Sequence, residues 1–259
     1  MAEPVRWETI EGVAKVVLNR PKSYNAFDLE MVTILADGMA GLAGDPQVKG
    51  VVITGEGAAF SAGGDLRWLA DSGRTPGAAF HVLASKYHQA ILEIRRMPKP
   101  VIAAINGLAA GGGFSAALAC DFRIMETSAT LRQGYTSNGL SIDGGGTFTL
   151  SRIVGMAKAM EIAALDRPIS AELALNWGLV TEVTEDGKSV NRAVKLVHEI
   201  NRIPLSSFAA CKQLITDAFD SSFEAQIEKE REFLARCADH PNGREGVAAF
   251  LEKRKPVYT

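Results

Sequence analysis

The stretch that decides the fold is glycine-rich, Asn106-Gly107-Leu108-Ala109-Ala110-Gly111-Gly112-Gly113. It follows the apolar run 100–105, which is typical of a buried parallel strand, and it leads into a helix-like segment over 113–119. A second turn of this kind, Phe60-Ser61-Ala62-Gly63-Gly64-Asp65-Leu66, follows another apolar run over 50–55. Strand, turn and helix in succession predict stacked right-handed β/α units.

The two turns also suggest a chemical use for the backbone. Each glycine of the triplet 111–113 costs roughly 1 kcal/mol of conformational entropy relative to alanine in regular structure, so something is expected to approach the backbone closely. A helix N-terminus after the triplet would add unpaired N–H groups and partial positive charge. Two such turns together would form an oxyanion hole, which holds one oxygen that becomes negative during a reaction. Close strand–helix packing explains the glycines equally well.

The rest of the chain divides into two regions. Strand patterns over 14–19, 50–55, 100–105 and 130–133 alternate with helical patterns over 29–42, 78–97 and 113–119. From residue 191 onward the pattern is helical, with breaks at Ile203-Pro204 and at His240-Pro241-Asn242-Gly243. We therefore predict an α/β core over 1–190 and a helical, oligomerisation region over 191–259. Its last helix, 244–253, packs either on its own core or on a neighbouring subunit.

Composition narrows the class of protein. The chain has 259 residues, 47% hydrophobic and 22% charged, which suits one large soluble α/β domain. A net charge of −2 argues against nucleic-acid binding. Cys120, Cys211 and Cys237 fit no metal or disulfide framework and indicate a reducing compartment. The N-terminus lacks an apolar signal segment, and the uncharged run 100–120 is interrupted by glycines. We expect a cytoplasmic protein with no metal site and no membrane span.

Phosphate-binding motifs fit the glycines less well. A dinucleotide fingerprint that begins at Gly111 would need a third glycine where the chain has Ala116. A P-loop that ends at Gly187-Lys188-Ser189 would need its first glycine where the chain has Glu182. Neither motif is therefore complete.

Several stretches in series closely resemble the enoyl-CoA hydratase/isomerase (crotonase) superfamily. They cover nearly the whole chain and are Arg20-Pro21 with Asn25-Ala26, 60–66, Asn106-Gly107 with 111–113, Cys120-Asp121, 152–155, 174–180 and 253–256. The resemblance implies an α/β fold, a crotonase-like spiral of β-β-α units with a helical C-terminal region for trimerisation. It also implies acyl-CoA substrates, a homotrimer or a dimer of trimers, and no cofactor other than coenzyme A as part of the substrate.

The resemblance places an oxyanion hole at the N–H groups of Gly64 and Gly112, where it would stabilise a thioester enolate. Loss of one such donor typically costs about 3–4 kcal/mol in the barrier. Residues beside the CoA thioester would be Asn25, Ala26, Ser61, Ala62, Asp65, Leu66 and Ser115. Asp65 is expected to fix its loop by hydrogen bonds rather than touch the substrate. Candidates for the acyl cavity, or for plain core, are Trp68, Leu69, Phe80 and Leu83.

The chain departs from the hydratases at the base. Those enzymes use two glutamates, and the matching positions here are Ser115 and Tyr135, so the usual route of water addition is not expected. Asp143 instead resembles the catalytic aspartate of several enoyl-CoA and dienoyl-CoA isomerases and the nucleophilic aspartate of 4-chlorobenzoyl-CoA dehalogenase. Because Ile142 and glycines flank it, a poorly solvated pocket is expected, which favours proton transfer. The structural alternative for Asp143 is a turn aspartate or a helix N-cap before 144–150.

The leading hypothesis is an acyl-CoA double-bond isomerase in which Asp143 moves the proton while Tyr135 and Ser115 shape the pocket. An alternative is an aryl-CoA dehalogenase or hydrolase with Asp143 as nucleophile and His88 as base. His88 matches the dehalogenase base, but Tyr135 stands where that enzyme has tryptophan. Two further alternatives are a hydratase with a nonstandard base and a non-catalytic member that binds acyl-CoA or RNA.

Overall fold

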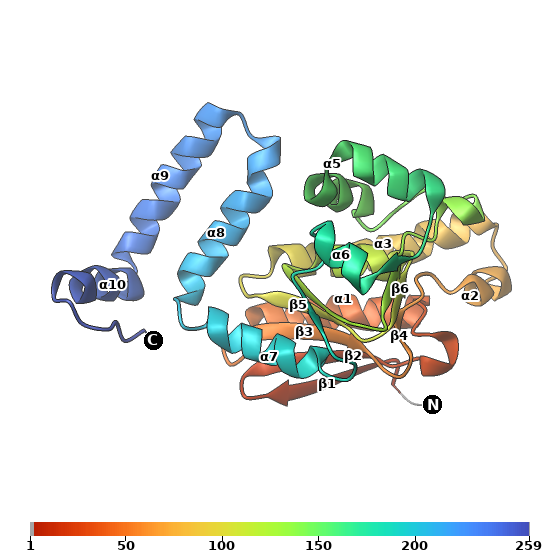
Figure 1. Cartoon of the computed structure of the whole chain (residues 1–259), viewed down its shortest axis with the longest axis horizontal. Helices are drawn as coiled ribbons and strands as arrows, with labels where there is room; N and C mark the ends of the chain where they lie inside the picture. The colour runs from red at the N-terminus through yellow and green to blue at the C-terminus, as the bar shows by residue number, and fades with distance from the viewer. Residues whose placement is uncertain (1–2, 259) are drawn as a thin grey trace.

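The computed structural model describes residues 3–258, which form two sheets surrounded by helices (Figure 1). The larger sheet has the strand order β1-β2-β3-β5-β7-β10, and the smaller has the order β4-β6-β8-β9. Strands of the larger sheet are Val5–Ile10 (β1), Val13–Leu18 (β2), Gly50–Gly55 (β3), Val101–Ile105 (β5), Phe122–Glu126 (β7) and Glu182–Thr184 (β10). Those of the smaller sheet are Ala59–Ser61 (β4), Leu108–Ala110 (β6), Thr130–Arg132 (β8) and Ile169–Ser170 (β9).

A repeated unit relates the two sheets. Strands β3, β5 and β7 pair in parallel in the larger sheet, and the strands that follow them, β4, β6 and β8, pair in parallel in the smaller one. Each pair of strands is followed by helix: Leu66–Asp71 (α2) and Pro76–Arg96 (α3), then Gly112–Ala119 (α4), then Gly146–Leu165 (α5). The α/β fold predicted from the sequence is confirmed as this spiral of β-β-α units.

Two further helices, one near the start of the core and one near its end, complete the helical layers around the sheets. Helix α1, Leu29–Gly44, packs along α3, and Ala171–Asn176 (α6) lies beside β9 and β10. Short 3-10 helices cover Pro21–Ser23, Thr136–Asn138 and Ala218–Asp220. Both glycine-rich turns contain a strand of the smaller sheet, β4 or β6, which the sequence did not predict. Three residues are too few for a periodic pattern to be recognised.

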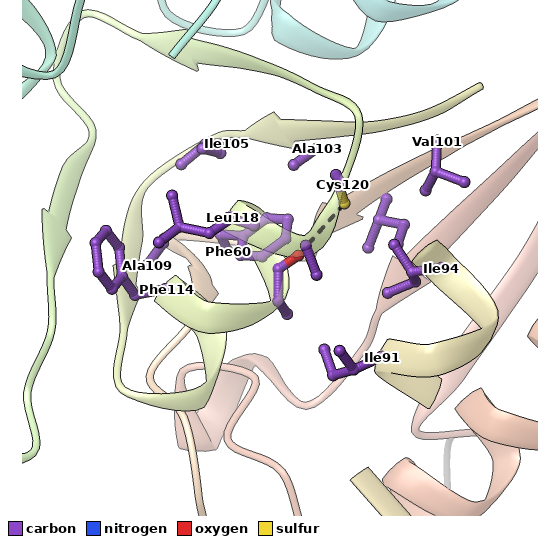
Figure 2. Packing of buried hydrophobic residues seen from close by; sticks show 14 of the residues in the cluster. Phe60, Ile91, Ile94, Val101, Ala103, Ile105, Ala109, Phe114, Leu118 and Cys120 are labelled. Atoms are coloured by element: carbon purple, nitrogen blue, oxygen red, sulfur yellow. Dashed lines mark hydrogen bonds between the residues drawn. The ribbon is translucent and has the colours of Figure 1, made fainter. Parts of the chain in front are cut away.

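The main hydrophobic core lies around α4, which is buried along its whole length. Phe114 and Leu118 of α4 pack with Phe60 of β4, with Ile91 and Ile94 of α3, and with strand β5 (Figure 2). Cys120, at the end of α4, donates a long hydrogen bond of 3.4 Å to the Ala116 carbonyl. Burial raises the pKa of this thiol to about 12. Cys120 is therefore a packing residue.

The opposite face of the larger sheet is covered by α7, Ser189–Ile200, whose Ala193, Val194 and Val197 pack on β3, β5 and β7. Helix α7 thus belongs to the core, although most of it falls in the region 191–259. The helices that stand away from the sheets are α8 (Leu205–Asp217), α9 (Phe223–Asp239) and α10 (Pro241–Leu251), which we call the C-terminal arm (Figure 1). Among the described residues, no helix has both the length and the apolar character needed to cross a bilayer.

Candidate active site

A cavity of about 350 Å³ lies where the two glycine-rich turns meet α3 and the segment 135–143. Its lining includes Gly64 and Gly112 from the turns and Asp143 from the facing segment. The side chains of Phe27, Phe80, Tyr87 and Tyr135 contribute four phenyl or phenol rings to the lining. We call it the acyl cavity. Sequence segments far apart in the chain thus bring main-chain donors and one carboxyl group to the same hollow.

The first turn leaves the Gly64 N–H free. Phe27 and Gly64 form an isolated parallel bridge, in which the Phe27 N–H donates to Gly63 and the Asp65 N–H donates to Phe27, at 2.7 and 2.9 Å. In a parallel bridge the residue between these two partners points its own N–H away from the paired strand. No hydrogen bond from this amide is found among the described residues. It is thus available to a ligand in the acyl cavity.

Asp65 fixes this turn, as the sequence led us to expect. One carboxyl oxygen caps α2 by accepting the N–H groups of Arg67 and Trp68, at 3.0 and 3.2 Å, and the other accepts a 2.8 Å hydrogen bond from Arg20. Burial alone would raise the pKa of Asp65, but the Arg20 guanidinium and the two N–H groups outweigh it and hold the pKa below its ordinary value. Asp65 therefore stays ionised and keeps the start of α2 in place beside Gly64.

Asn25 and Ser61 support the same turn from behind. Asn25 has a left-handed backbone (φ 56°) and donates through Nδ2 to the Ala59 carbonyl at 2.7 Å. The Ser61 hydroxyl donates to the Asn25 carbonyl at 2.8 Å and accepts the Gly63 N–H at 3.2 Å. Both side chains are completely buried, so they position the turn and do not face the cavity.

The remaining residues that the resemblance placed near CoA lie outside the acyl cavity wall. Ala26 is buried, and its carbonyl accepts a hydrogen bond from Arg20. Ala62 is half-buried, and Leu66 is exposed on the outside of α2. Both positions therefore reach the protein surface beside the first glycine-rich turn.

The second turn presents Gly112, the first residue of α4. Its N–H has no acceptor within the helix, because the first four amides of a helix precede any carbonyl they could reach. The two turns touch: a Cβ on Gly63 would lie 2.7 Å from the Gly112 nitrogen, and one on Gly113 would lie 2.2 Å from the Ser61 carbonyl oxygen. The glycines thus allow close approach of two backbones. Gly64 and Gly112 both line the acyl cavity, so their two amides are candidates to hold a single oxygen there.

Asp143 lies on the facing wall, where its carboxyl group is half-buried. Oδ1 accepts a 2.5 Å hydrogen bond from the Tyr135 hydroxyl, and Oδ2 lies 3.4 Å from His88 Nε2. Helix α5 begins at Gly146 and has Gly145 as its N-cap, so the Asp143 side chain does not cap it. The capping alternative is therefore wrong, and the carboxyl group is left to face the cavity.

Tyr135 and Ser115, which the family resemblance matched to the two hydratase glutamates, lie close to each other. The Tyr135 hydroxyl lies 3.4 Å from Ser115 Oγ, in addition to its hydrogen bond to Asp143. Burial raises the pKa of Tyr135 far above its ordinary value, and the nearby Asp143 carboxylate raises it further. The phenol therefore stays protonated and donates to Asp143. Ser115 is completely buried behind it and does not line the cavity.

His88 approaches Asp143 from a different side. Its Nε2 accepts the Gly144 N–H at 3.2 Å and lies near Asp143 Oδ2. The ring lines a second cavity, of about 510 Å³, between α3, α5 and the end of α8, and it is not part of the acyl cavity wall. A water held by His88 would therefore approach Asp143 from the second cavity and not from the acyl cavity.

Two of the four apolar residues that were candidates for the acyl cavity line it. Phe80 and Leu83 line the acyl cavity, whereas Trp68 and Leu69 do not. The sequence analysis missed Phe27 and Tyr87, because single aromatic residues near a turn or within a helix are indistinguishable from core. Among the described residues there is no cluster of His, Cys, Asp or Glu that could hold a metal ion.

Comparison with known proteins agrees with this geometry. A family model described as enoyl-CoA hydratase/isomerase matches residues 8–259. The chain belongs to the enoyl-CoA hydratase/isomerase family. The crystal structure of an enoyl-CoA hydratase from Polaromonas sp. JS666 has a TM-score of 0.92 and 36% sequence identity, and the match covers 98% of this chain and 99% of that one.

Relatives within the enoyl-CoA hydratase/isomerase family carry different activities. The 1,2-epoxyphenylacetyl-CoA isomerase of Escherichia coli K12 is 35% identical over 96% of this chain and 95% of its own length. The 4-chlorobenzoyl coenzyme A dehalogenase-2 of an Arthrobacter species is 32% identical over 95% and 90%. The short-chain-enoyl-CoA hydratase of Clostridium acetobutylicum is 32% identical over 94% and 92%. Isomerases, hydratases and dehalogenases are thus all similar to this chain.

Proposed function

We propose that the protein is an acyl-CoA double-bond isomerase with Asp143 as its acid/base. The observation that carries this proposal is the arrangement of the acyl cavity. Gly64 and Gly112, whose amides have no partner among the described residues, line the same cavity as Asp143, which the Tyr135 hydroxyl holds at 2.5 Å. Among the described lining residues, Asp143 is the single carboxylate.

In the mechanism we propose, the thioester oxygen accepts both amide N–H groups. The negative charge that develops on this oxygen is then stabilised, which makes a neighbouring C–H bond acidic. A base takes this proton while the bond electrons form the enolate. The Asp143 carboxylate, held through Oδ1 by the Tyr135 hydroxyl, takes the proton and returns it two carbons away. General acid–base catalysis of this kind contributes roughly 10²–10⁴-fold to the rate.

The same wall argues against hydration. A hydratase of the usual type needs two carboxylates to position and activate water, and Ser115 and Tyr135 stand in their places. The Ser115 hydroxyl is buried behind the cavity wall, and the Tyr135 hydroxyl is engaged with Asp143. A nonstandard hydratase would have to use Asp143 alone, without a partner carboxylate in the cavity.

The shape of the cavity favours an acyl group that contains a ring. Four aromatic side chains line it, and aromatic pairs contribute about 0.5–1.5 kcal/mol beyond the area that they bury. By name, the Escherichia coli relative acts on an epoxyphenylacetyl-CoA and the Arthrobacter relative on a chlorobenzoyl-CoA. We therefore place cyclic and aryl-substituted acyl-CoA thioesters ahead of long straight chains.

The test is exchange of the α-hydrogens of phenylacetyl-CoA in D₂O, followed by mass spectrometry. Asp143→Asn keeps the size of the side chain but removes the base, so exchange is expected to fall by about 10³-fold. Asp239→Asn, at an exposed aspartate on the arm, is the matched control and is expected to leave the rate unchanged. Exchange by Asp143→Asn at the wild-type rate would remove Asp143 from the mechanism.

A second function, aryl-CoA dehalogenation or hydrolysis, is favoured by one contact, that of His88 Nε2 with Asp143 Oδ2. In this route Asp143 attacks the ring carbon, a halide leaves, and His88 activates the water that cleaves the ester. Rapid quench with 4-chlorobenzoyl-CoA distinguishes the two functions. Only the nucleophilic route leaves an aryl group covalently attached to Asp143, which peptide mass spectrometry detects.

We further propose that the arm assembles the chain into a homotrimer or a dimer of trimers. Large apolar side chains are exposed along the arm, namely Ile215, Phe219, Phe223, Ile227, Leu234, Val247, Phe250 and Leu251. Exposed apolar surface of this extent marks an interaction site. Sedimentation should show trimers or hexamers, and Phe250→Glu should dissociate them. A monomer at micromolar concentration would contradict this assembly.

The proposed chemistry needs no metal and no redox cofactor, since coenzyme A enters as part of the substrate. We place the enzyme in the cytoplasm, where acyl-CoA thioesters and reduced thiols occur together. Exhaustive chelation with EDTA should leave α-hydrogen exchange unchanged, and a loss of exchange that added metal restores would contradict the proposed chemistry.

A further inference from the structure

Tyr87 is a buried phenol at the acyl cavity for which the proposed mechanism has no role. It lies on α3, its side chain is almost fully buried, and its hydroxyl donates a 2.5 Å hydrogen bond to the Gly112 carbonyl. Gly112 is the first residue of α4, after the N-cap Gly111, whose carbonyl accepts the Ser115 N–H. The phenol therefore binds within the first turn of the helix that presents the Gly112 amide.

Gly112 is held from a second direction by Phe27. A Cβ on Gly112 would lie 3.3 Å from Phe27 Cδ2, so the ring packs directly against the glycine. The rings of Phe27 and Tyr87 are themselves in contact, with centroids 5.3 Å apart and planes tilted by 30°. Two aromatic side chains thus fix the Gly112 peptide, one by contact and the other by a hydrogen bond.

Tyr87 also touches the opposite wall of the cavity. Gly144, the residue after Asp143, is buried with φ 60°. A Cβ on Gly144 would lie 2.5 Å from Tyr87 Cε1 and 2.7 Å from its hydroxyl oxygen. The turn that carries Asp143 therefore packs against the edge of the same ring that binds Gly112.

We infer that Tyr87 is a positioning residue that sets the separation between the Gly112 amide and the Asp143 carboxyl group. Its hydroxyl holds the Gly112 carbonyl, in the peptide that follows the Gly112 N–H, and so anchors the residue that presents this amide. Its ring is a rigid spacer against Gly144. The inference rests on the proposed function, because it supposes that both groups act on one substrate. Such separations decide rates, since a displacement of about 1 Å at a reacting centre can cost roughly 10²-fold.

The state of the phenol suits this role. Burial raises the pKa of Tyr87 well above its ordinary value, and the neighbouring Tyr135 and Asp143 raise it further. The hydroxyl thus remains a donor throughout the working pH range. It acts on the reaction through Gly112 and needs no proton transfer of its own.

The first test separates the hydroxyl from the ring. Tyr87→Phe keeps the spacer and removes the hydrogen bond to Gly112, so kcat for exchange of phenylacetyl-CoA should fall about 10-fold while KM stays within about twofold. The infrared stretch of bound phenylacetyl-CoA, labelled with ¹³C at the thioester carbonyl, should move toward its value in free solution. This stretch reports how strongly the two amides polarise the carbonyl.

Tyr135→Phe is the matched control, because it removes a phenol that binds Asp143 and has no hydrogen bond to Gly112. It should lower kcat and leave the carbonyl stretch unchanged. If Tyr87→Phe shifts neither kcat nor the stretch, the inference is wrong, and the Asp143→Asn result stands independently. If Asp143→Asn exchanges normally but Tyr87→Phe still shifts the stretch, the proposed base fails and the role of Tyr87 at Gly112 remains.

The second test alters the contact between the Tyr87 ring and Gly144. Gly144→Ala pushes a methyl group against Tyr87, whereas Gly145→Ala places one in open space, and both glycines have positive φ, 60° and 74°. The backbone strain is therefore similar, and the contact with Tyr87 is the difference. Gly144→Ala should exchange at least about 10-fold more slowly than Gly145→Ala. Equal rates in two variants of equal melting temperature would overturn the spacer role.

Discussion

The two walls of the acyl cavity are built in different ways. The wall with Gly64 and Gly112 offers main-chain amides, and its neighbours exist to bring two backbones into contact. The facing wall offers the side chain of Asp143, aimed by Tyr135 and flanked by His88. A main-chain donor survives every substitution of its residue except proline, whereas a carboxyl group is lost by most single substitutions.

This difference separates the main-chain part of the site, which substitutions rarely remove, from the side-chain part, which they readily change. Relatives that are named isomerase, hydratase and dehalogenase are all similar to this chain over nearly its whole length. An oxyanion hole serves every reaction that builds negative charge on a thioester oxygen. We therefore expect the amide wall to affect folding when it is altered, and the side-chain wall to affect the choice and rate of reaction.

The largest expected effect is on stability, from Gly113→Ala in the amide wall. The added Cβ would lie 2.2 Å from the Ser61 carbonyl oxygen, so the two turns would have to separate. Overpacking of a core typically costs 1–3 kcal/mol, and because backbone is the obstacle here we expect about 3 kcal/mol in the free energy of unfolding by urea. Gly41→Ala, on α1 with no atom within 4 Å, is the control and should not destabilise. Equal stability of both variants would contradict close packing of the turns.

Tyr135→Phe tests the side-chain wall and should leave the fold intact. It removes the hydrogen bond to Asp143 Oδ1, and hydrogen bonds to charged groups contribute about 1.5–3 kcal/mol. We expect kcat to fall by roughly 10–100-fold, with little change in melting temperature. Tyr24→Phe, at an exposed tyrosine, is the control. Unchanged turnover would show that Asp143 is aimed without Tyr135.

Asp65→Asn tests the electrostatic support of the Gly64 turn. Asparagine still caps α2, so the loss is the charged hydrogen bond from Arg20, about 1.5 kcal/mol of unfolding free energy near neutral pH. The folded-state pKa of Asp65 lies below its ordinary value of 3.8, so the ionised carboxylate stabilises the fold above that pH. The difference between wild type and variant should be constant from pH 5 to 8 and shrink as the pH falls below about 4. A stability difference between wild type and variant that grows as the pH falls would contradict the predicted direction of the pH dependence.

His88→Gln is expected to have the smallest effect. His88 lies outside the acyl cavity wall, so α-hydrogen exchange should slow by no more than about fivefold, which corresponds to about 1 kcal/mol in the barrier. Leu92→Ala, one turn later on α3 and in the same second cavity, controls for packing. A loss of 10³-fold or more with 4-chlorobenzoyl-CoA as substrate would instead favour the hydrolytic function.

The amide wall was easier to predict from the sequence than its surroundings. Serial glycines after apolar runs indicated two turns in which backbones come close, and the family resemblance placed the donors at Gly64 and Gly112. The longer strands and helices have clear periodicity, and the C-terminal helices were predicted on that basis. Tyr87 was not recognised, because its partner Gly112 lies 25 residues away and a tyrosine on an amphipathic helix resembles ordinary core.

Asp143 was identified through the family resemblance and not through its local sequence. Its neighbours Ile142 and Gly144 fit a helix cap as well as a catalytic turn. The N-cap of α5 at Gly145 excludes the cap, and the contacts with Tyr135 and His88 show where the carboxyl group lies. Those contacts join α3 to the loop after β8. The periodicity of the two segments does not indicate that they meet. Long-range pairing of this kind depends on the spiral as a whole.

The cysteines differ in their exposure, so an exposed one can report on the docking of subunits. Cys120 is sealed in the core with a pKa of about 12, whereas Cys211 is exposed on α8 of the arm. A maleimide dye should therefore attach at Cys211 well before Cys120, far from the acyl cavity and without any engineered cysteine. Slower labelling of Cys211 as the protein concentration rises would follow the docking of subunits directly in solution.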